Sequence, residues 1–218
     1  YPNSDYVGSS MYWIGESYAA EGKLDEAIDF LTQAIEDKSS NRFRDHSLYA
    51  LASVYEKMED YQNAVKYYDQ LLTYHSSSPL ALQAQVRIGV CYFYLKDYYN
   101  SILELNNPTI QDLPSEKLAE ALYLLANSHY RIEEYSNAAK SYTEIIERFP
   151  RSPLYRNAQY GLAWSLFQQS KYHEAYNYFN VLSQGNDSTA IKSFIWKGEC
   201  KRYAGSPNEA LAIFEEFL

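Results

Sequence analysis

The sequence predicts an all-α solenoid of six stacked helical hairpins, and a repeat of 37 residues is the first reason. A small residue recurs along the chain and is followed twelve positions later by an alanine or a serine, with a final step of 35 residues. The six pairs are Gly15/Ala27, Ala52/Ala64, Gly89/Ser101, Ala126/Ala138, Ala163/Ala175 and Gly198/Ala210. A fixed period of this size is typical of helical-hairpin repeats, in which small residues let paired helices approach closely.

Residues that favour helix N-termini hold the same register, eleven positions before each small residue. Their side-chain oxygens accept hydrogen bonds from the free amides of a first helical turn. They are Ser4, Asn41, Ser78, Ser115, Ser152 and Asp187. Pro79 and Pro153 follow two of them, and proline is favoured at the first helical position. We therefore expect each first helix to begin directly after these residues.

Short polar turns divide each repeat into two helices, and apolar residues recur at helical spacing within them. The first helices are expected at 5–21, 42–58, 79–95, 116–132, 153–169 and 188–204. The second helices are expected at 24–37, 61–74, 98–106, 135–148, 172–183 and 207–218. The repeats then span about 4–40, 41–77, 78–114, 115–151, 152–186 and 187–218, as one solenoid domain over 1–218.

The aromatic and leucine positions of each repeat complete a pattern that resembles the tetratricopeptide repeat family. Three residues after the small residue come Tyr18, Tyr55, Tyr92 and Leu166, and four after the alanine come Leu31, Tyr68, Leu105, Tyr142, Phe179 and Phe214. The resemblance implies a right-handed superhelical solenoid that binds other proteins and has no catalytic activity. The usual period of that family is 34 residues, so we expect first helices that start earlier and are longer.

The short segment that connects successive repeats, here called the joint, indicates one group within this family. Phe149-Pro150-Arg151-Ser152-Pro153 is echoed at Tyr1-Pro2-Asn3-Ser4 and Ser76-Ser77-Ser78-Pro79. It resembles the joint of bacterial cell-envelope tetratricopeptide proteins, namely outer-membrane assembly lipoproteins and periplasmic proteins of the Tol-Pal system. The implied location is the periplasm or the periplasmic face of the outer membrane, with the cytoplasm as the alternative.

Composition limits the partners. The formal net charge is −9, whereas nucleic-acid binding requires concentrated lysine and arginine. No apolar run is long enough to span a bilayer, so we expect no membrane insertion by this segment. The chain begins like the tail of an earlier repeat and stops within a second helix, which predicts a fragment of a longer protein. Open apolar ends would also permit a homo-oligomer.

No catalytic, metal or cofactor motif is found in the sequence. The four histidines lie in different repeats without metal-ligand spacing, and His129 holds a core position. Cys91 and Cys200 occupy the same repeat position, three repeats apart, so we expect free, packed thiols rather than a disulfide.

The strongest functional signal is a set of aromatic residues on one face of the first helices. The positions three before, one after and four after the small residue share this face. In the family that the chain resembles, this face lines a concave groove that holds a peptide or a partner helix. Large rigid rings suit such a role, because they bury area at low entropic cost. The predicted groove residues are Tyr12, Tyr49, Phe93, Tyr123, Tyr130, Tyr160, Trp164 and Phe167.

Several alternatives to a peptide-binding groove stay open. The rings of Tyr12 and Tyr49 could instead pack against a neighbouring repeat, and the residues that begin second helices, Tyr61, Tyr98, Tyr135 and Tyr172, are more simply structural. The module could assemble with itself, or it could bind glycans by stacking. Chaperone-binding members of the family clamp a terminal carboxylate with lysine, asparagine and arginine. The matching positions here are Tyr12, Glu16, Tyr49 and Ser53, so no such clamp is expected.

The third repeat is irregular. Asn106-Asn107-Pro108 interrupts its second helix, because proline lacks the amide and collides with the preceding turn. Thr109 to Pro114 is then expected to be an irregular connection. We expect either a local change of superhelical curvature there or a tolerated surface defect.

Overall fold

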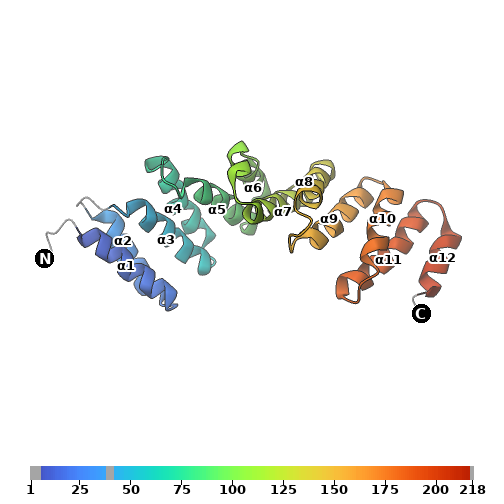
Figure 1. Ribbon diagram of the computed structural model, residues 1–218, viewed down its shortest axis with the longest axis horizontal. Helices are drawn as coiled ribbons and strands as arrows, with labels where there is room; N and C mark the ends of the chain where they lie inside the picture. The colour runs from blue at the N-terminus through green and yellow to red at the C-terminus, as the bar shows by residue number, and fades with distance from the viewer. Residues whose placement is uncertain (1–5, 38–41, 217–218) are drawn as a thin grey trace. The chain divides into compact units, whose positions relative to one another are not determined.

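The computed structural model describes residues 6–37 and 42–216, and within these ranges every regular element is helical (Figure 1). The described residues contain no strand, which confirms the predicted all-α fold. The helices are α1 (Val7–Ala20), α2 (Leu24–Glu36), α3 (Arg44–Lys57), α4 (Tyr61–Tyr74), α5 (Ala81–Tyr94), α6 (Tyr98–Leu105), the 3-10 helix η1 (Pro108–Asp112), α7 (Ser115–Arg131), α8 (Tyr135–Arg148), α9 (Tyr155–Gln168), α10 (Tyr172–Leu182), α11 (Ser188–Tyr203) and α12 (Pro207–Glu216).

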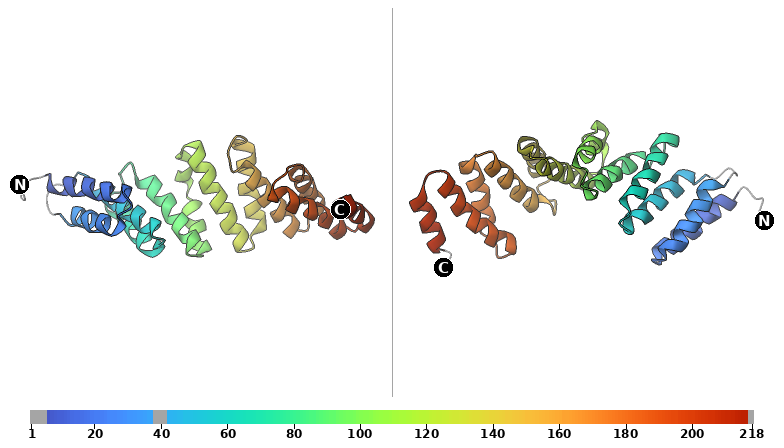
Figure 2. Two further views of the ribbon diagram at one scale, coloured as in Figure 1. Left: turned by 90° about the horizontal axis from the view of Figure 1, so that it is seen from below. Right: turned by 180° about the vertical axis from the view of Figure 1, so that it is seen from behind.

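Each odd-numbered helix forms a hairpin with the even-numbered helix that follows it, and the two helices lie side by side in every view (Figure 2). In the hairpins whose small residue is a glycine, that glycine lies in close contact with the second helix. A Cβ atom placed on Gly89 would lie 2.6 Å from Cγ of Leu105, and one on Gly198 would lie 2.5 Å from the Phe214 ring. In two other hairpins, Ala64 and Ala138, the partners of Ala52 and Ala126, are fully buried. The predicted close approach of the paired helices is confirmed.

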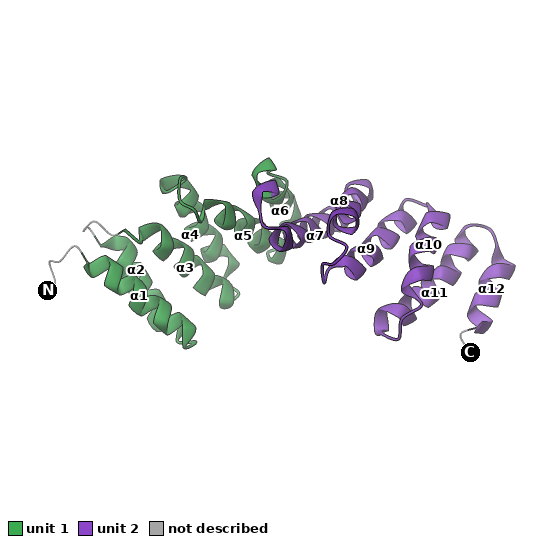
Figure 3. Cartoon of the chain, in the orientation of Figure 1, with its two compact units in different colours: residues 1–110 green, residues 111–218 purple. Residues whose placement is uncertain are grey.

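The hairpins fall into two compact units of three hairpins each (Figure 3). Unit 1 comprises Tyr1–Ile110 and contains α1 to α6, and unit 2 comprises Gln111–Leu218 and contains α7 to α12. The division falls at the interruption that the sequence places in the third repeat. That the whole chain acts as one solenoid domain stays a prediction, as does a change of curvature at this point.

The interruption has a defined structure. Helix α6 ends at Leu105, one residue earlier than predicted, and Pro108–Asp112 form the 3-10 helix η1. The side chain of Asn107, directly ahead of η1, accepts hydrogen bonds from the amide and the hydroxyl of Thr109. Ile110 and Leu113 are buried. The expected irregular connection is therefore partly a short 3-10 helix.

The predicted helix starts need correction. Asp187 caps α11 by accepting a 2.7 Å hydrogen bond from the amide of Ala190, as predicted. Ser78 and Ser152 instead accept from the amides of Leu80 and Leu154, two residues on, in a turn that precedes the helix. Ser115 is the first residue of α7 and not its cap. Ser4 and Asn41 lie outside the described residues.

The expectation of longer first helices is wrong for α1, α3, α5 and α9, which have 14 residues each. Ahead of α5 and α9, the extra residues of the 37-residue period lie in turns that precede the helix. Pro79 and Pro153 lie in those turns and not at the first helical position. A serine oxygen serves a turn or a cap equally well, and the backbone ahead of these helices adopts the turn.

The hairpin turns share one backbone conformation. In all six turns the residue seven positions after the small residue has a positive φ of 60° to 83°: Gly22, Glu59, Lys96, Glu133, Ser170 and Gly205. Four of the six therefore hold a side chain in the left-handed region, which disfavours L-residues other than glycine.

We expect Lys96→Gly to raise the free energy of unfolding by about 0.5–1 kcal/mol, because glycine adopts this conformation without the Cβ clash. The converse change, Gly22→Ala, should lower it by about 1 kcal/mol, although no atom lies within 4 Å of the added Cβ. Urea unfolding of the two variants measures both effects. Equal shifts of the same sign would contradict the backbone explanation.

Both cysteines are buried and free, as predicted. Burial raises the pKa of the Cys91 thiol to about 11 and that of the Cys200 thiol to about 12. Because the thiolate is the reactive form, we expect labelling by a disulfide reagent at pH 8 to be at least about a hundredfold slower in the folded protein than in urea, where thiols have a pKa near 8.5. A spectrophotometric time course measures this ratio. Rapid reaction of either thiol in the native protein would contradict the burial.

Candidate functional site

The predicted groove residues of unit 1 lie on α1, α3 and α5, and they differ in exposure. Tyr12 is only 7% exposed, and its ring stacks on Phe43 with centroids 5.2 Å apart. The Tyr49 ring meets the buried Tyr68 ring edge-on at 5.2 Å. Phe93 is half-buried and meets Tyr98 edge-on at 5.6 Å. Tyr12 thus belongs to the core between α1 and α3, which is the packing alternative considered for it above.

A polar contact connects three helices of unit 1. Glu56 on α3 accepts hydrogen bonds from Nε of Arg87 at 2.9 Å and from the hydroxyl of Tyr68 at 3.1 Å. Its side chain is 10% exposed and that of Arg87 is 39% exposed. Glu56 lies four residues after Ala52, a predicted groove position. In this repeat an ion pair between α3 and α5 occupies the position that Tyr130 and Phe167 hold in unit 2.

In unit 2, the tyrosine three residues before the small residue makes a repeated contact. Tyr123 meets the buried ring of Tyr142 edge-on, and Tyr160 meets the buried ring of Phe179 in the same way, both at 5.9 Å. The hydroxyl of Tyr142 donates a 2.8 Å hydrogen bond to Asn127. Tyr123 and Tyr160 are half-buried, and each lies with one edge against the second helix of its own hairpin.

An aromatic surface connects α9 with α11. We use this name for Trp164 and Phe167 on α9 together with Trp196 and Tyr203 on α11. The centroids of Trp164 and Trp196 are 4.2 Å apart, those of Phe167 and Trp196 are 5.3 Å apart, and those of Phe167 and Tyr203 are 5.2 Å apart. Tyr172, at the start of α10, closes one side and meets Phe167 at 5.2 Å. Tyr203 is 51% exposed, and the other three rings are half-buried.

The structure thus brings Trp164 and Phe167 together with two residues that the sequence analysis did not select. Trp196 lies two residues before Gly198 and Tyr203 lies five after it, each one residue away from the positions used for the predicted groove. A count of the aromatic residues in 188–204 would have drawn attention to them. Tyr130 lies on α7, where its ring meets Tyr135 edge-on at 5.3 Å.

The border of the aromatic surface is charged. Arg202 lies over the Tyr203 ring, with its guanidinium carbon 4.4 Å from the ring centroid. Its Nε donates to Glu199 at 3.0 Å. An exposed tyrosine ring and three half-buried rings beside a guanidinium and a carboxylate resemble the mixed apolar and polar composition of protein interfaces.

The described residues hold no group of three or more histidine, cysteine, aspartate or glutamate side chains that could bind a metal ion. His129 is 9% exposed, and its Nδ1 lies 2.7 Å from a carboxylate oxygen of Glu134. Hydrogen bonds from Asn137 and His129 lower the pKa of the Glu134 carboxyl. His129 is therefore a packed and hydrogen-bonded residue, as predicted. In the described part of the chain, no helix combines the length and apolar character needed to cross a bilayer.

Two family models match most of this chain. A model described as a tetratricopeptide repeat matches residues 6–77, and a second model of the same description matches 49–107 and 123–188, which is more than half of the chain. The chain belongs to the tetratricopeptide repeat family. Tetratricopeptide repeats generally mediate protein–protein interaction, and their fold is generally non-catalytic.

Individual relatives are distant. The heat shock protein STI1 of Saccharomyces cerevisiae is 23% identical over 142 residues, which cover 65% of this chain and 21% of that protein. The chain thus spans about a fifth of this relative's length. A tetratricopeptide repeat protein from Parabacteroides merdae matches with a TM-score of 0.71 and 18% identity, over 96% of this chain and 78% of that one. MamA from Desulfovibrio magneticus RS-1 matches with a TM-score of 0.67 and 18% identity, over 80% and 92%. These likenesses establish the tetratricopeptide fold.

Proposed function

We propose that this tetratricopeptide protein is a non-catalytic scaffold that binds a segment of a partner protein on the aromatic surface of α9 and α11. The observation that carries the proposal is the group of four rings, Trp164, Phe167, Trp196 and Tyr203, with neighbouring centroids 4.2 to 5.3 Å apart. Contiguous apolar patches are uncommon on monomers without a binding role, and tryptophan and tyrosine are enriched at binding hot spots. Tyr123, Tyr130 and Tyr160 would extend the contact along unit 2.

Affinity capture from lysate of the source cells tests this proposal. The wild-type chain is compared with Phe167→Ala/Tyr203→Ala, which removes two rings from the surface, and with Tyr74→Ala, which removes an exposed tyrosine of unit 1. Circular dichroism first establishes that all three proteins are folded. We expect a specific protein that the wild type and Tyr74→Ala both capture and that the double variant loses.

The competing functions have distinct outcomes in the same experiment. Capture of further copies of the same protein, with light scattering that rises with concentration, would indicate self-assembly. Retention of soluble glycan fragments without a protein would indicate a glycan-binding module. Identical captures by wild type and double variant would contradict a site on the aromatic surface.

We further propose that the partner is a component of the bacterial cell envelope. The support for this is the joint Phe149-Pro150-Arg151-Ser152-Pro153 with its two echoes, which resembles that of envelope members of the family. Fractionation of source cells with an antibody against the chain tests it. Recovery with periplasmic or outer-membrane material is expected, and recovery with cytoplasmic markers would contradict it.

A further inference from the structure

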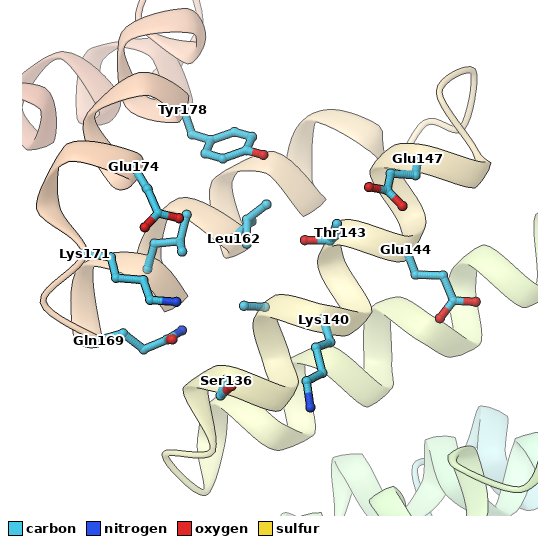
Figure 4. Close-up of a pocket in the computed structure, with 12 residues that line it drawn as sticks. Ser136, Lys140, Thr143, Glu144, Glu147, Leu162, Gln169, Lys171, Glu174 and Tyr178 are labelled. Carbon is cyan, nitrogen blue, oxygen red and sulfur yellow. The ribbon is translucent and has the colours of Figure 1, made fainter.

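A second surface of unit 2 has the shape and the charges of a binding site. It is a cleft of about 450 Å³ whose walls are α8 and α10 and whose floor is α9 (Figure 4). Leu162 and Leu166 lie at its floor. Leu162 is two residues away from Trp164 on the same helix, so the two side chains point in nearly opposite directions at 100° per residue. The cleft is therefore separate from the aromatic surface.

Both lysines of the cleft lie at one end, whereas its acidic residues extend from the middle to the other end. Glu144, one turn after Lys140, is one of them and pairs with Arg148. Figure 4 shows Lys140 and Lys171 toward one end and Glu147 and Tyr178 toward the other, with Glu174 on the α10 wall. Burial raises the pKa of the Tyr178 hydroxyl, and so do Tyr155, Glu147 and Glu174, which indicates a negative potential at that end. Lys140 and Glu147 are seven residues apart on α8, or about 10 Å along the helix axis.

These charges are available to a ligand. Within the described part of the chain, Lys171, Glu147 and Glu174 have no oppositely charged side chain within ion-pair distance. The ammonium of Lys140 donates a 3.4 Å hydrogen bond to the side-chain oxygen of Asn137, a neutral group. A ligand that places a carboxylate at the lysine end and a cation at the glutamate end would pair with groups that otherwise face solvent.

The next hairpin lacks this combination. The positions that correspond to Leu162 and Leu166, 35 residues later, are Lys197 and Lys201. Lys197 lies 3.8 Å from a carboxylate oxygen of Glu216, and Lys201 lies 2.8 Å from one of Glu209. An apolar floor beneath unpaired charges is thus a property of the cleft between α8 and α10 and is not repeated between α10 and α12.

We propose that the cleft between α8 and α10 is a second peptide-binding site, which takes an extended segment of a partner protein with an acidic and a basic side chain four residues apart. Side chains of an extended chain alternate between its two faces, so residues four apart face the cleft together. At about 3.3 Å per residue they lie about 13 Å apart, which is enough to span the roughly 10 Å between the charged ends. The acidic side chain pairs with Lys140 and Lys171, and the basic one pairs with Glu147. An apolar side chain between them packs on the small edges of Leu162 and Leu166 that reach the cleft, since these two leucines are 4% and 6% exposed.

Two charge reversals test the proposal without disturbing the helices. Lys171 precedes the first residue of α10 and Glu147 lies in the last turn of α8. Acidic residues are favourable at helix N-termini and basic residues at C-termini, so Lys171→Glu and Glu147→Lys should both fold. Lys66→Glu is the matched control, because Lys66 holds the register of Lys140 two repeats earlier, on α4.

The probe is a phage-displayed library of random nine-residue peptides, selected on the full wild-type chain. We expect enriched peptides that carry opposite charges four residues apart around an apolar residue. Fluorescence anisotropy of such a peptide should give a Kd at least about tenfold weaker for Lys171→Glu and for Glu147→Lys, and an unchanged Kd for Lys66→Glu.

The double reversal Lys171→Glu/Glu147→Lys keeps the total charge of the chain and alters only its placement. A peptide with its two charges exchanged should bind this variant better than it binds the wild type. No enrichment on the wild type, enriched peptides that bind both single variants as tightly as the wild type, or peptides that lose affinity only with Phe167→Ala/Tyr203→Ala would overturn the proposal.

Discussion

Replacing Phe179 with alanine is expected to lower the free energy of unfolding by about 3–5 kcal/mol, the largest effect of any single substitution considered for this chain. The Phe179 side chain is fully buried, and its ring meets Tyr160 at 5.9 Å and Trp164 at 6.0 Å. Removing it deletes apolar contacts and leaves a cavity that helices held by neighbouring hairpins fill only in part. Urea unfolding followed by circular dichroism measures the loss.

Val181→Ala is the matched control for Phe179→Ala. Val181 lies two residues further along α10 and is 59% exposed, so its truncation should change the free energy of unfolding by less than about 0.5 kcal/mol. The fluorescence of Trp164 should change with Phe179→Ala, because the two rings are in contact. Similar losses for the two variants would contradict the assignment of Phe179 to the core of unit 2.

Gly161→Val is expected to lower the free energy of unfolding by about 2–3 kcal/mol. Glycine is a poor helix former, so substitution within α9 would ordinarily be neutral or favourable. Here a Cβ atom on Gly161 would lie 2.4 to 2.7 Å from the outer ring atoms of Tyr142. That ring is 2% exposed and its hydroxyl is hydrogen-bonded to Asn127, so it cannot move aside without losing packing and a hydrogen bond.

A double-mutant cycle separates this clash from other effects. Tyr142→Leu removes the outer ring atoms, so Gly161→Val should cost at least about 1 kcal/mol less in the Tyr142→Leu background than in the wild type. Asn157→Val, at an exposed position of α9, controls for the intrinsic effect of valine in this helix. Additive losses in the cycle would show that Tyr142 is not the reason for the glycine.

The fold could be predicted from the sequence because its geometry depends on the residues that repeat. Gly15, Gly89 and Gly198 lie where the paired helices cross, and a bulkier residue there would meet Leu31, Leu105 or Phe214. The helix starts were harder to predict, because Ser78 and Ser152 have side chains that serve a turn as well as a cap. The extra residues of the period therefore became turn and not helix.

The candidate site could be predicted only in part. The repeat positions predicted Trp164 and Phe167. They gave Tyr12 and Tyr49 the same role, because Phe43, whose ring stacks on Tyr12, lies outside the repeat pattern. They missed Trp196 because a large ring reaches a neighbour from one residue outside the chosen positions. The cleft between α8 and α10 depends on which charges lack partners, and only three-dimensional contacts reveal that.

Photo-crosslinking in the source cells tests the central claim most directly, with a benzophenone amino acid placed at position 203 or, as a control, at position 74. Both positions are exposed tyrosines, on α11 and at the end of α4. If the aromatic surface binds a partner, position 203 should give a crosslink to a specific protein that position 74 does not give, and Phe167→Ala should remove it. The same crosslinks from both positions, or a crosslink from 203 that persists with Phe167→Ala, would contradict the claim.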